Sequence, residues 1–201
     1  MNKESIVLGS GYFYCVEFEG TNKDIPDNKT LETEENLLGY IKGGASIEYK
    51  PTFYEAKDDM GRVSKLITTD EEATLKSGIM TWCGKTLERL CNTARVIEDK
   101  ANNKRIVKIG GIANSINKMY VLHFVHKDSK DGDIRITIVG NNQAGFTISF
   151  AKESETVIDA EFKAQPMDKE GTLILYEEEI MAGANTETPN DTYETPKING
   201  E

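Results

Sequence analysis

The chain has 201 residues, of which 38% are hydrophobic and 29% are charged, and its formal net charge at pH 7 is -10. These proportions are ordinary for a folded domain, and no apolar run approaches the ~20 residues that a membrane-spanning helix needs. The negative charge disfavours a protein that binds DNA through its phosphates, because such binding needs a basic surface.

Two further features bear on the compartment. Residues Met1–Ser5 contain no basic region followed by an apolar block, so we expect no signal peptide. The three cysteines, Cys15, Cys83 and Cys91, are odd in number and not closely paired. That pattern is typical of free thiols in a reducing compartment, where cysteines act as small apolar residues.

The first predicted element is a strand over Ile6–Glu19, in which aromatic and apolar residues occupy every second position. A long polar connection follows over Gly20–Leu37. Loops of this length in a compact domain are usually functional. We therefore expect this connection to be a functional loop or to become ordered on a partner.

The longest predicted feature is a β-hairpin over Gly39–Ile79. Apolar and polar residues alternate over Ala45–Phe53, which is typical of a half-buried strand. Residues Asp58–Gly61 supply turn chemistry, because Asp bonds its own backbone and Gly accepts a positive φ. On the returning strand, apolar residues occupy every second position only over Ala73–Ile79. The middle of the hairpin, about Tyr54–Thr69, is polar or out of phase on both faces, so we expect it to project as an arm.

One helix is predicted over Met80–Thr93, after a strand that Gly78 ends and with Thr81 as its N-cap. Its apolar residues follow the i, i+3, i+4, i+7 spacing of an amphipathic helix, and they are Leu87, Leu90, Cys91 and Ala94. A helix this short draws its stability from packing. We therefore expect it to pack on a sheet, with Trp82 in the core.

The remaining segments predict short strands separated by turns. The strands are Ala94–Glu98, Arg105–Ile109, Lys118–His126, Ile134–Ile138, Ala144–Phe150, Thr156–Ala164 and Thr172–Glu177. The turns are Asp99–Lys104, Asp128–Asp133, Asn141-Asn142 and Asp168–Gly171. The strand at 118–126 carries bulky residues on both faces and is placed centrally. This pattern predicts a mainly β fold, a β-sandwich or barrel, with one packed helix and one long projecting hairpin.

Charge is concentrated at the C-terminal end. Residues Glu177–Glu201 contain seven acidic residues and one lysine. Such a segment buries too little apolar surface to offset its ordering entropy. We therefore expect one β domain over residues 1–182, with the arm at about 54–69 and the helix at about 80–93, and an acidic disordered tail over 183–201.

The sequence contains no motif for catalysis or phosphate binding: GxSxG, GxxxxGK[ST], a helix-opening GxGxxG and CxxC are all missing. The two histidines, His123 and His126, are three residues apart. On a strand this spacing sends them to opposite faces, which disfavours a shared metal. We expect a protein that is not an enzyme and has no cofactor and no metal. Asp159 and Glu161 share one strand face, either as a solvated outer surface or as the lining of an aqueous passage.

Two stretches resemble the major tail tube proteins of tailed bacteriophages. Residues Leu38–Tyr49 (LGYIKGGASIEY) are similar to the start of that family's long hairpin, and the acidic stretch Thr69–Leu75 followed by one helix continues the pattern. Residues Asp159–Leu173 resemble the family's penultimate strand, turn and last strand. The resemblance covers most of Ile6–Glu179 in the order of its elements.

The resemblance implies a structural virion protein with the tail-tube fold. Hexameric rings would form with a continuous inner barrel and stack into a tube, the conduit for DNA ejection into the host, without specific DNA binding. It also implies assembly in the bacterial host cytoplasm, no membrane association, and other tail proteins as partners, such as the tape measure and the tail terminator. The length, loop and tail are closer to the long-tailed, non-contractile (siphovirus) type.

Two sets of residues receive a role from this resemblance. The arm would reach the neighbouring ring with its tip residues Lys57, Asp58, Asp59, Met60, Gly61 and Arg62, whose mixed charges indicate a polar, salt-sensitive contact. Asp159 and Glu161 would face the lumen, where like charge raises the energy of phosphates uniformly.

Two other classes stay open. One is the tube protein of a contractile tail or of a phage-derived secretion or bacteriocin particle, which shares the ring. The other is a β-barrel ligand-binding protein. That class needs a cavity with convergent polar groups, and the sequence shows no constellation to line one.

Overall fold

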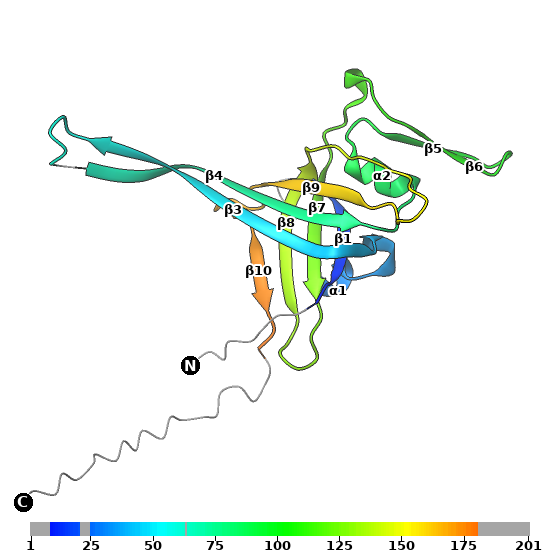
Figure 1. Ribbon diagram of the computed structural model, residues 1–201, viewed down its shortest axis with the longest axis horizontal. Coiled ribbons are helices and arrows are strands. Elements are labelled where there is room, and N and C mark those ends of the chain that lie inside the picture. Colours follow the sequence, from blue (N-terminus) through cyan, green and yellow to red (C-terminus); the bar gives the residue numbers. More distant parts are fainter. Residues whose placement is uncertain (1–8, 21–24, 63, 181–201) are drawn as a thin grey trace, which may run out of the picture.

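The computed structural model describes residues 9–20, 25–62 and 64–180. Within them the protein is mainly β, with an eight-stranded antiparallel sheet and a second sheet of two strands (Figure 1). The main sheet contains β1 (Tyr12–Phe18), β2 (Leu37–Gly39), β3 (Ile41–Lys57), β4 (Ser64–Ile79), β7 (Met119–His126), β8 (Ile134–Asn142), β9 (Ile158–Gln165) and β10 (Leu175–Glu178). The second sheet pairs β5 (Arg95–Asp99) with β6 (Lys104–Lys108). The helices are α1 (Asn28–Leu31) and α2 (Gly84–Leu90), with 3-10 turns at Glu34–Asn36 and Ile112–Asn114. The predicted mainly β class is confirmed.

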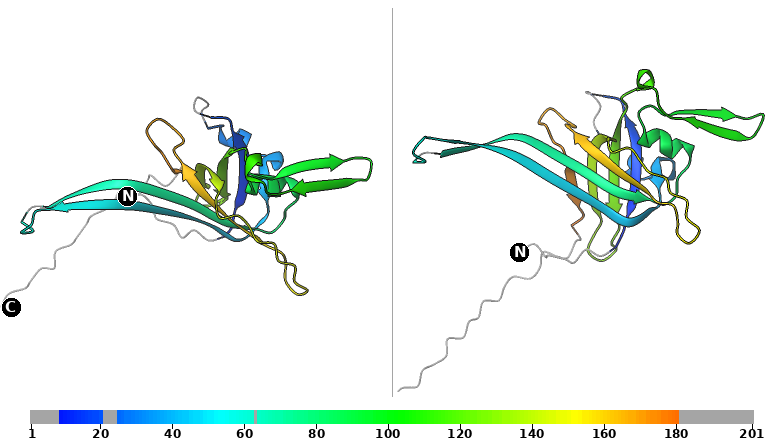
Figure 2. Two further views of the ribbon diagram at one scale, coloured as in Figure 1. Left: turned by 90° about the horizontal axis from the view of Figure 1, so that it is seen from above. Right: turned by 45° about the horizontal axis from the view of Figure 1, so that its top comes forward.

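The main sheet folds over on itself. Its order is β2-β1-β7-β8-β9-β4-β3, and β10 pairs with β8. The first residues of β8 pair with β10 and its last with β9, so the sheet divides there. Beyond this division β9, β4 and β3 cross the direction of β1, β7 and β8 (Figures 1 and 2). The ring centroids of Phe13 on β1 and Phe162 on β9 therefore lie 5.6 Å apart, although two strands separate them in the sheet.

The main core lies between these two halves of the sheet. Alternate residues of β4 and β9 supply much of it: Ala73, Leu75, Ile79, Ile158, Ala160, Phe162 and Ala164. This confirms the two-residue period predicted for both strands. All residues of β7 after Met119 are buried, which confirms its central placement. A smaller cluster of Leu31, Val121 and Val139 covers the other face of β7 and β8.

The long predicted hairpin is confirmed as β3 and β4, paired from Ile41 and Ile79 out to Lys57 and Ser64. Its outer part projects well beyond the rest of the sheet (Figures 1 and 2). Near its base β3 carries two extra residues, Gly43 and Gly44, whose φ angles of 83° and 77° favour glycine.

Gly78 does not end β4, contrary to the prediction. The strand continues to Ile79, and a Cβ at Gly78 would lie 2.8 Å from the Lys42 carbonyl oxygen and 2.9 Å from Val157. Glycine here permits the close approach of neighbouring backbone rather than a break in the strand.

The helix α2 is shorter than predicted, and Cys83 rather than Thr81 is its N-cap. The Cys83 N–H donates to the Thr86 hydroxyl at 3.2 Å, and the Thr81 hydroxyl instead accepts from the Tyr40 N–H at 2.7 Å. The N–H groups of Met80 and Thr81 both donate to the Tyr40 carbonyl. These bonds hold 80–81 against the start of β3, so the helix begins only after them.

Replacing Leu87 by Ala is expected to lower the free energy of unfolding by about 2–3 kcal/mol, in the lower part of the range for buried leucines. Leu87 is 9% exposed and Leu90 only 1%, and both belong to the main core. Urea denaturation measures the change. Lys85→Ala on the exposed side of α2 is the control, expected to shift stability by less than about 0.5 kcal/mol. An unchanged midpoint for Leu87→Ala would contradict this packing.

The predicted turn at Asn141-Asn142 and the strand at Ala144–Phe150 are both wrong. Asn142 is buried in β8, and its side-chain amide donates to the carbonyls of Leu90 (3.0 Å) and Gly145 (2.7 Å). The chain then runs without regular structure from Gln143 to Val157. Alternating apolarity correctly marks the partly buried side chains of Phe146 and Ile148, but it does not supply a neighbouring strand.

Two predictions fall wholly or partly outside the described residues. The acidic tail over 183–201 lies outside them, as do residues 6–8 of the first predicted strand. Within the described part, that strand begins at Tyr12 rather than earlier.

Candidate functional site

The predicted contact residues Lys57, Asp58, Asp59, Met60, Gly61 and Arg62 form the tip of the arm, and all of them are exposed. The Gly61 N–H donates to the Asp58 carbonyl at 2.9 Å, and the φ angle of 66° at Gly61 suits glycine in a tight turn. The Lys57 ammonium pairs with Glu55 at 2.9 Å, and the Arg62 guanidinium contacts the Met60 sulfur. The tip is therefore a turn closed by local contacts and presented to solvent.

The arm also carries large apolar side chains, which do not follow the two-residue period of the rest of the hairpin. They are Phe53 (54% exposed), Tyr54 (58%), Leu66 (61%) and Ile67 (44%). Direct cross-strand partners share a face, and the pairs Tyr54–Ile67 and Glu55–Leu66 are consecutive. Each face of the arm therefore exposes apolar surface. The signal in the sequence is the pair of apolar doublets, since neighbouring residues on a strand point to opposite faces.

Exposed apolar surface of this kind is typical of interaction sites, because soluble monomers rarely expose contiguous apolar patches without a function. The expected contact is therefore more hydrophobic than the charges at the tip alone suggest. Its polar part remains at the tip.

Asp159 and Glu161 lie on the face of β9 that points away from the core. They do not form a uniformly acidic surface, because lysines lie beside them. Glu161 pairs with Lys76 at 3.1 Å, and Lys163 pairs with Glu72 at 2.5 Å. Two further lysines on this side of β3, Lys42 and Lys50, pair with Glu155 and Glu48. The outer face of β3, β4 and β9 is thus a surface of matched charges.

The polar connection over Gly20–Leu37 is ordered within the chain in its described part, residues 25–37. The Asp27 carboxylate caps α1 by accepting from the Thr30 N–H at 3.1 Å. The Asn36 amide donates to the carbonyls of Thr30 and Leu31, which closes the following turn. Residues 25–37 are thus held by contacts within the chain, and a functional role for this loop stays a prediction.

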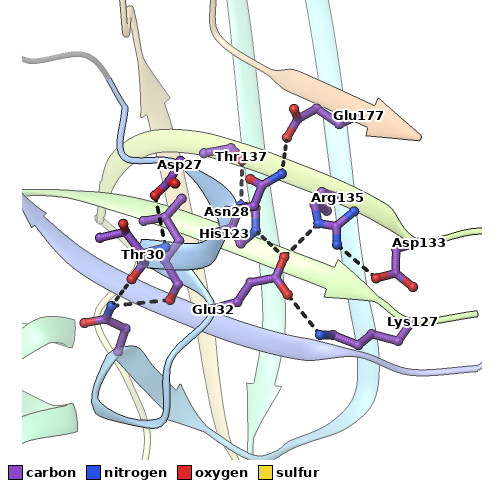
Figure 3. A network of polar contacts seen from close by, with 12 residues as sticks. Asp27, Asn28, Thr30, Glu32, His123, Lys127, Asp133, Arg135, Thr137 and Glu177 are labelled. Atoms are coloured by element: carbon purple, nitrogen blue, oxygen red, sulfur yellow. Dashed lines mark hydrogen bonds and ion pairs between the residues drawn. The ribbon is translucent and has the colours of Figure 1, made fainter. Parts of the chain in front are cut away.

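Glu32 attaches this loop to the sheet (Figure 3). Its nearly buried carboxylate accepts from Arg135 Nε at 2.7 Å and from Lys127 Nζ at 2.9 Å. Its Oε1 also lies 3.7 Å from Nε2 of His123, whose Nδ1 is 2.7 Å from the Thr137 hydroxyl. Asp133 pairs with Arg135 from the other side at 2.9 Å. The network joins the loop to β7 and β8, a role that no local pattern in the sequence predicts.

Burial and charge shift the pKa values in this network. Burial lowers the pKa of His123 below its ordinary value of 6.5, although the nearby Glu32 carboxylate opposes that shift. Burial alone would raise the pKa of Glu32, but the hydrogen bonds from Arg135 and Lys127 outweigh it and hold that pKa below 4.5.

Stability is expected to fall in two stages as the pH decreases. The unfolded chain takes up a proton on His123 near pH 6.5, before the folded chain does, so the free energy of unfolding declines below that pH. The stabilisation by ionised Glu32 is complete above pH 4.5 and is lost as the pH falls towards the lower folded pKa. Urea denaturation at several pH values measures both stages. His123→Gln should reduce the slope of the upper stage and leave the lower stage, and an unaltered upper slope would contradict the assignment.

The histidines lie on opposite faces of β7, as their spacing predicts. His123 faces Glu32, whereas Nδ1 of His126 lies 2.8 Å from the Ser10 carbonyl oxygen. Among the described residues, no group of three or more His, Cys, Asp or Glu side chains is placed to hold a metal ion. None of the described helices is long and apolar enough to cross a membrane.

Two open grooves lie along the long hairpin. One, of about 610 Å³, runs beside Gly43 and Gly44 and is flanked by Lys42, Lys76 and Glu161. Both lysines are already paired with carboxylates, so this groove offers a ligand few unmatched polar groups. The other, of about 470 Å³, lies at the root of the arm and is lined by Thr68, Thr69, Asp70, Glu71, Pro166, Gly171 and Leu173.

No protein-family model matches the chain, and no curated protein matches it in sequence.

Proposed function

We propose that the protein is a major tail tube protein of a long-tailed bacteriophage, with the tail-tube form of the β-sandwich or barrel. It forms hexameric rings that stack into the conduit for DNA ejection. The observation that carries this proposal is the arm, a paired hairpin that projects from the domain with apolar side chains exposed on both faces. Such a hairpin suits a subunit that is completed by its neighbours.

The free edges of the sheet support assembly through backbone pairing. Among the described strands, β3 pairs only with β4, which leaves its other edge unpaired along 17 residues. Long exposed edges promote aggregation unless they are covered. Joining sheets across subunits covers them, and a closed barrel removes edges altogether.

The matched charges of the outer face suit a wall that DNA passes without binding. In this proposal Asp159, Glu161 and the paired lysines of β3, β4 and β9 line the lumen. Phosphates bind to cations that have no carboxylate partner, and this binding releases the counterions of the DNA. Lys76 and Lys163 each have a carboxylate partner in the chain, so they attract phosphate weakly. The wall therefore avoids binding by charge pairing, with only a small contribution from excess negative charge.

Electron microscopy tests the proposal directly. Concentrated protein in negative stain should show rings or tubes with an axial channel, and sedimentation velocity should show oligomers that grow with concentration. A protein that stays monomeric at all concentrations would refute it.

A further inference from the structure

The two-stranded sheet β5–β6 presents an outer face that nothing in the described chain covers. Its inner face rests on α2, where Val107 and Arg105 approach Gly84, and Val107 packs against the main core. The outer face consists of three cross-strand pairs, Arg95–Lys108, Ile97–Ile106 and Asp99–Lys104. The central isoleucines are 44% and 40% exposed, so an apolar pair lies between charged ends.

This face is basic in an acidic protein. Its three cross-strand pairs carry the basic residues Arg95, Lys104 and Lys108 and one carboxylate, Asp99. Arg95 and Lys108 lie directly opposite each other, an arrangement that destabilises a strand pair by charge repulsion. Among the described residues, neither of these cations nor Lys104 pairs with a carboxylate. A partner that supplies carboxylates around an apolar centre would match all three.

The arm has the complementary composition on the face that continues from the core side of the hairpin. Tyr49, Phe53 and Leu66 form an exposed apolar stripe along it. Acidic residues accompany the stripe, since Glu71 lies on the same face opposite Pro51 and receives a hydrogen bond from the Tyr49 hydroxyl. At the arm's root, Glu71 also lines the smaller groove together with apolar Pro166 and Leu173, and nearer the tip Glu55 lies opposite Leu66 on this face. Residues 50–72 hold six acidic and four basic residues in all.

The two surfaces cannot meet within one copy. The arm and β5–β6 point in opposite directions along the long axis of the molecule, in Figure 1 and in both views of Figure 2. A contact between them must join two copies. It is heterologous, so the copy that supplies its arm keeps its β5–β6 surface free, the other copy keeps its arm free, and the contact repeats.

We propose that the outer face of β5–β6 in one copy docks on the arm of a second copy. The Ile97–Ile106 pair packs on Phe53 and Leu66, and the basic residues Lys104 and Lys108 meet the carboxylates of Glu55 and Glu71, which lie on the same face of the arm. This inference rests on the proposed function in that it names the surface that receives the arm in the assembly.

A charge exchange tests the contact in the full-length protein. The double variant Lys104→Glu, Lys108→Glu should raise the concentration needed for assembly by about tenfold or more, because it places like charges together. Adding Glu55→Lys and Glu71→Lys to the same chain should restore assembly towards that of the wild type. The matched control is Lys29→Glu, Lys130→Glu, which changes the net charge equally at exposed sites in α1 and in the turn between β7 and β8 and should leave assembly unchanged. Circular dichroism verifies that each variant is folded.

The outcomes separate the contact from the tube. If the wild type builds rings or tubes and the Lys104→Glu, Lys108→Glu variant builds them equally well, the contact is refuted and the tube function stands. The same conclusion follows if that variant loses assembly and the charge exchange does not restore it. If sedimentation shows self-association that follows the exchange but microscopy shows no tubes, the contact stands and the tube function fails. A wild type that never associates refutes both.

Discussion

Replacing residues Tyr54–Thr69 by a short turn is expected to abolish tube formation and to leave a folded monomer. No residue of this segment belongs to either core cluster, and all of its described residues are exposed. Its removal should therefore change the thermal midpoint little. The assembly, in contrast, loses the contact that the arm makes with another copy. Circular dichroism measures the fold, and negative-stain microscopy measures tubes.

Two partial variants show which part of the arm makes the contact. Replacing Phe53, Tyr54, Leu66 and Ile67 by Thr removes apolar surface and places a strand-favouring, β-branched residue at each position, so it should reproduce the loss of tubes. Replacing the tip carboxylates by Asp58→Asn and Asp59→Asn should weaken assembly less. Normal tubes from the shortened chain would show that the arm is not needed. Tubes from the threonine variant but not from the tip variant would show that the contact is polar.

Phe162→Ala is expected to lower the free energy of unfolding by about 3–5 kcal/mol, the range for a fully buried phenylalanine. Phe162 and Phe13 have no exposed surface, and their rings meet where β9 crosses β1. Deleting one ring leaves a cavity between the two halves of the sheet. Guanidinium denaturation measures the loss. Phe150→Ala is the matched control, because Phe150 is 82% exposed and should change stability by about 0.5 kcal/mol or less.

A double-mutant cycle with Phe13→Ala isolates the contact between the two rings. Aromatic pairs contribute about 0.5–1.5 kcal/mol beyond the area they bury, so a coupling of this size is expected. Additive losses would mean that the rings do not interact. A loss below about 1 kcal/mol for Phe162→Ala would contradict the packing of the two halves of the sheet.

The elements that the sequence determines are those whose signals are local. The period of two over Ala73–Ile79 and Ile158–Ala164 marks the core face of β4 and β9, because successive side chains on a strand alternate between faces. The turns at Asp58–Gly61 and Asp168–Gly171 form as predicted, since Asp and Gly carry their turn chemistry in their own side chains and backbone. The existence and projection of the long hairpin follow from the same two signals.

Other features depend on residues far apart in the chain. The helix starts after Thr81 because Tyr40 engages the backbone before it. Asn142 stays in a strand because the carbonyl of Leu90 accepts its amide. Glu32 is held by Arg135, 103 residues away, which orders a loop that reads as unstructured. A hydrogen bond or ion pair needs its partner in place, and no residue's own pattern reveals which distant group that is.

The surfaces available for assembly also depend on the tertiary structure. The doublets Phe53-Tyr54 and Leu66-Ile67 are visible in the sequence, but their pairing register shows that they are exposed on both faces of one arm. The sequence predicts a strand over Ala94–Glu98, whereas the open outer face of β5 follows from the packing of the other side of β5–β6 on α2. Local patterns specify which faces an element has. Tertiary packing decides which of those faces stays exposed to solvent, because the element buries its other face against a neighbour.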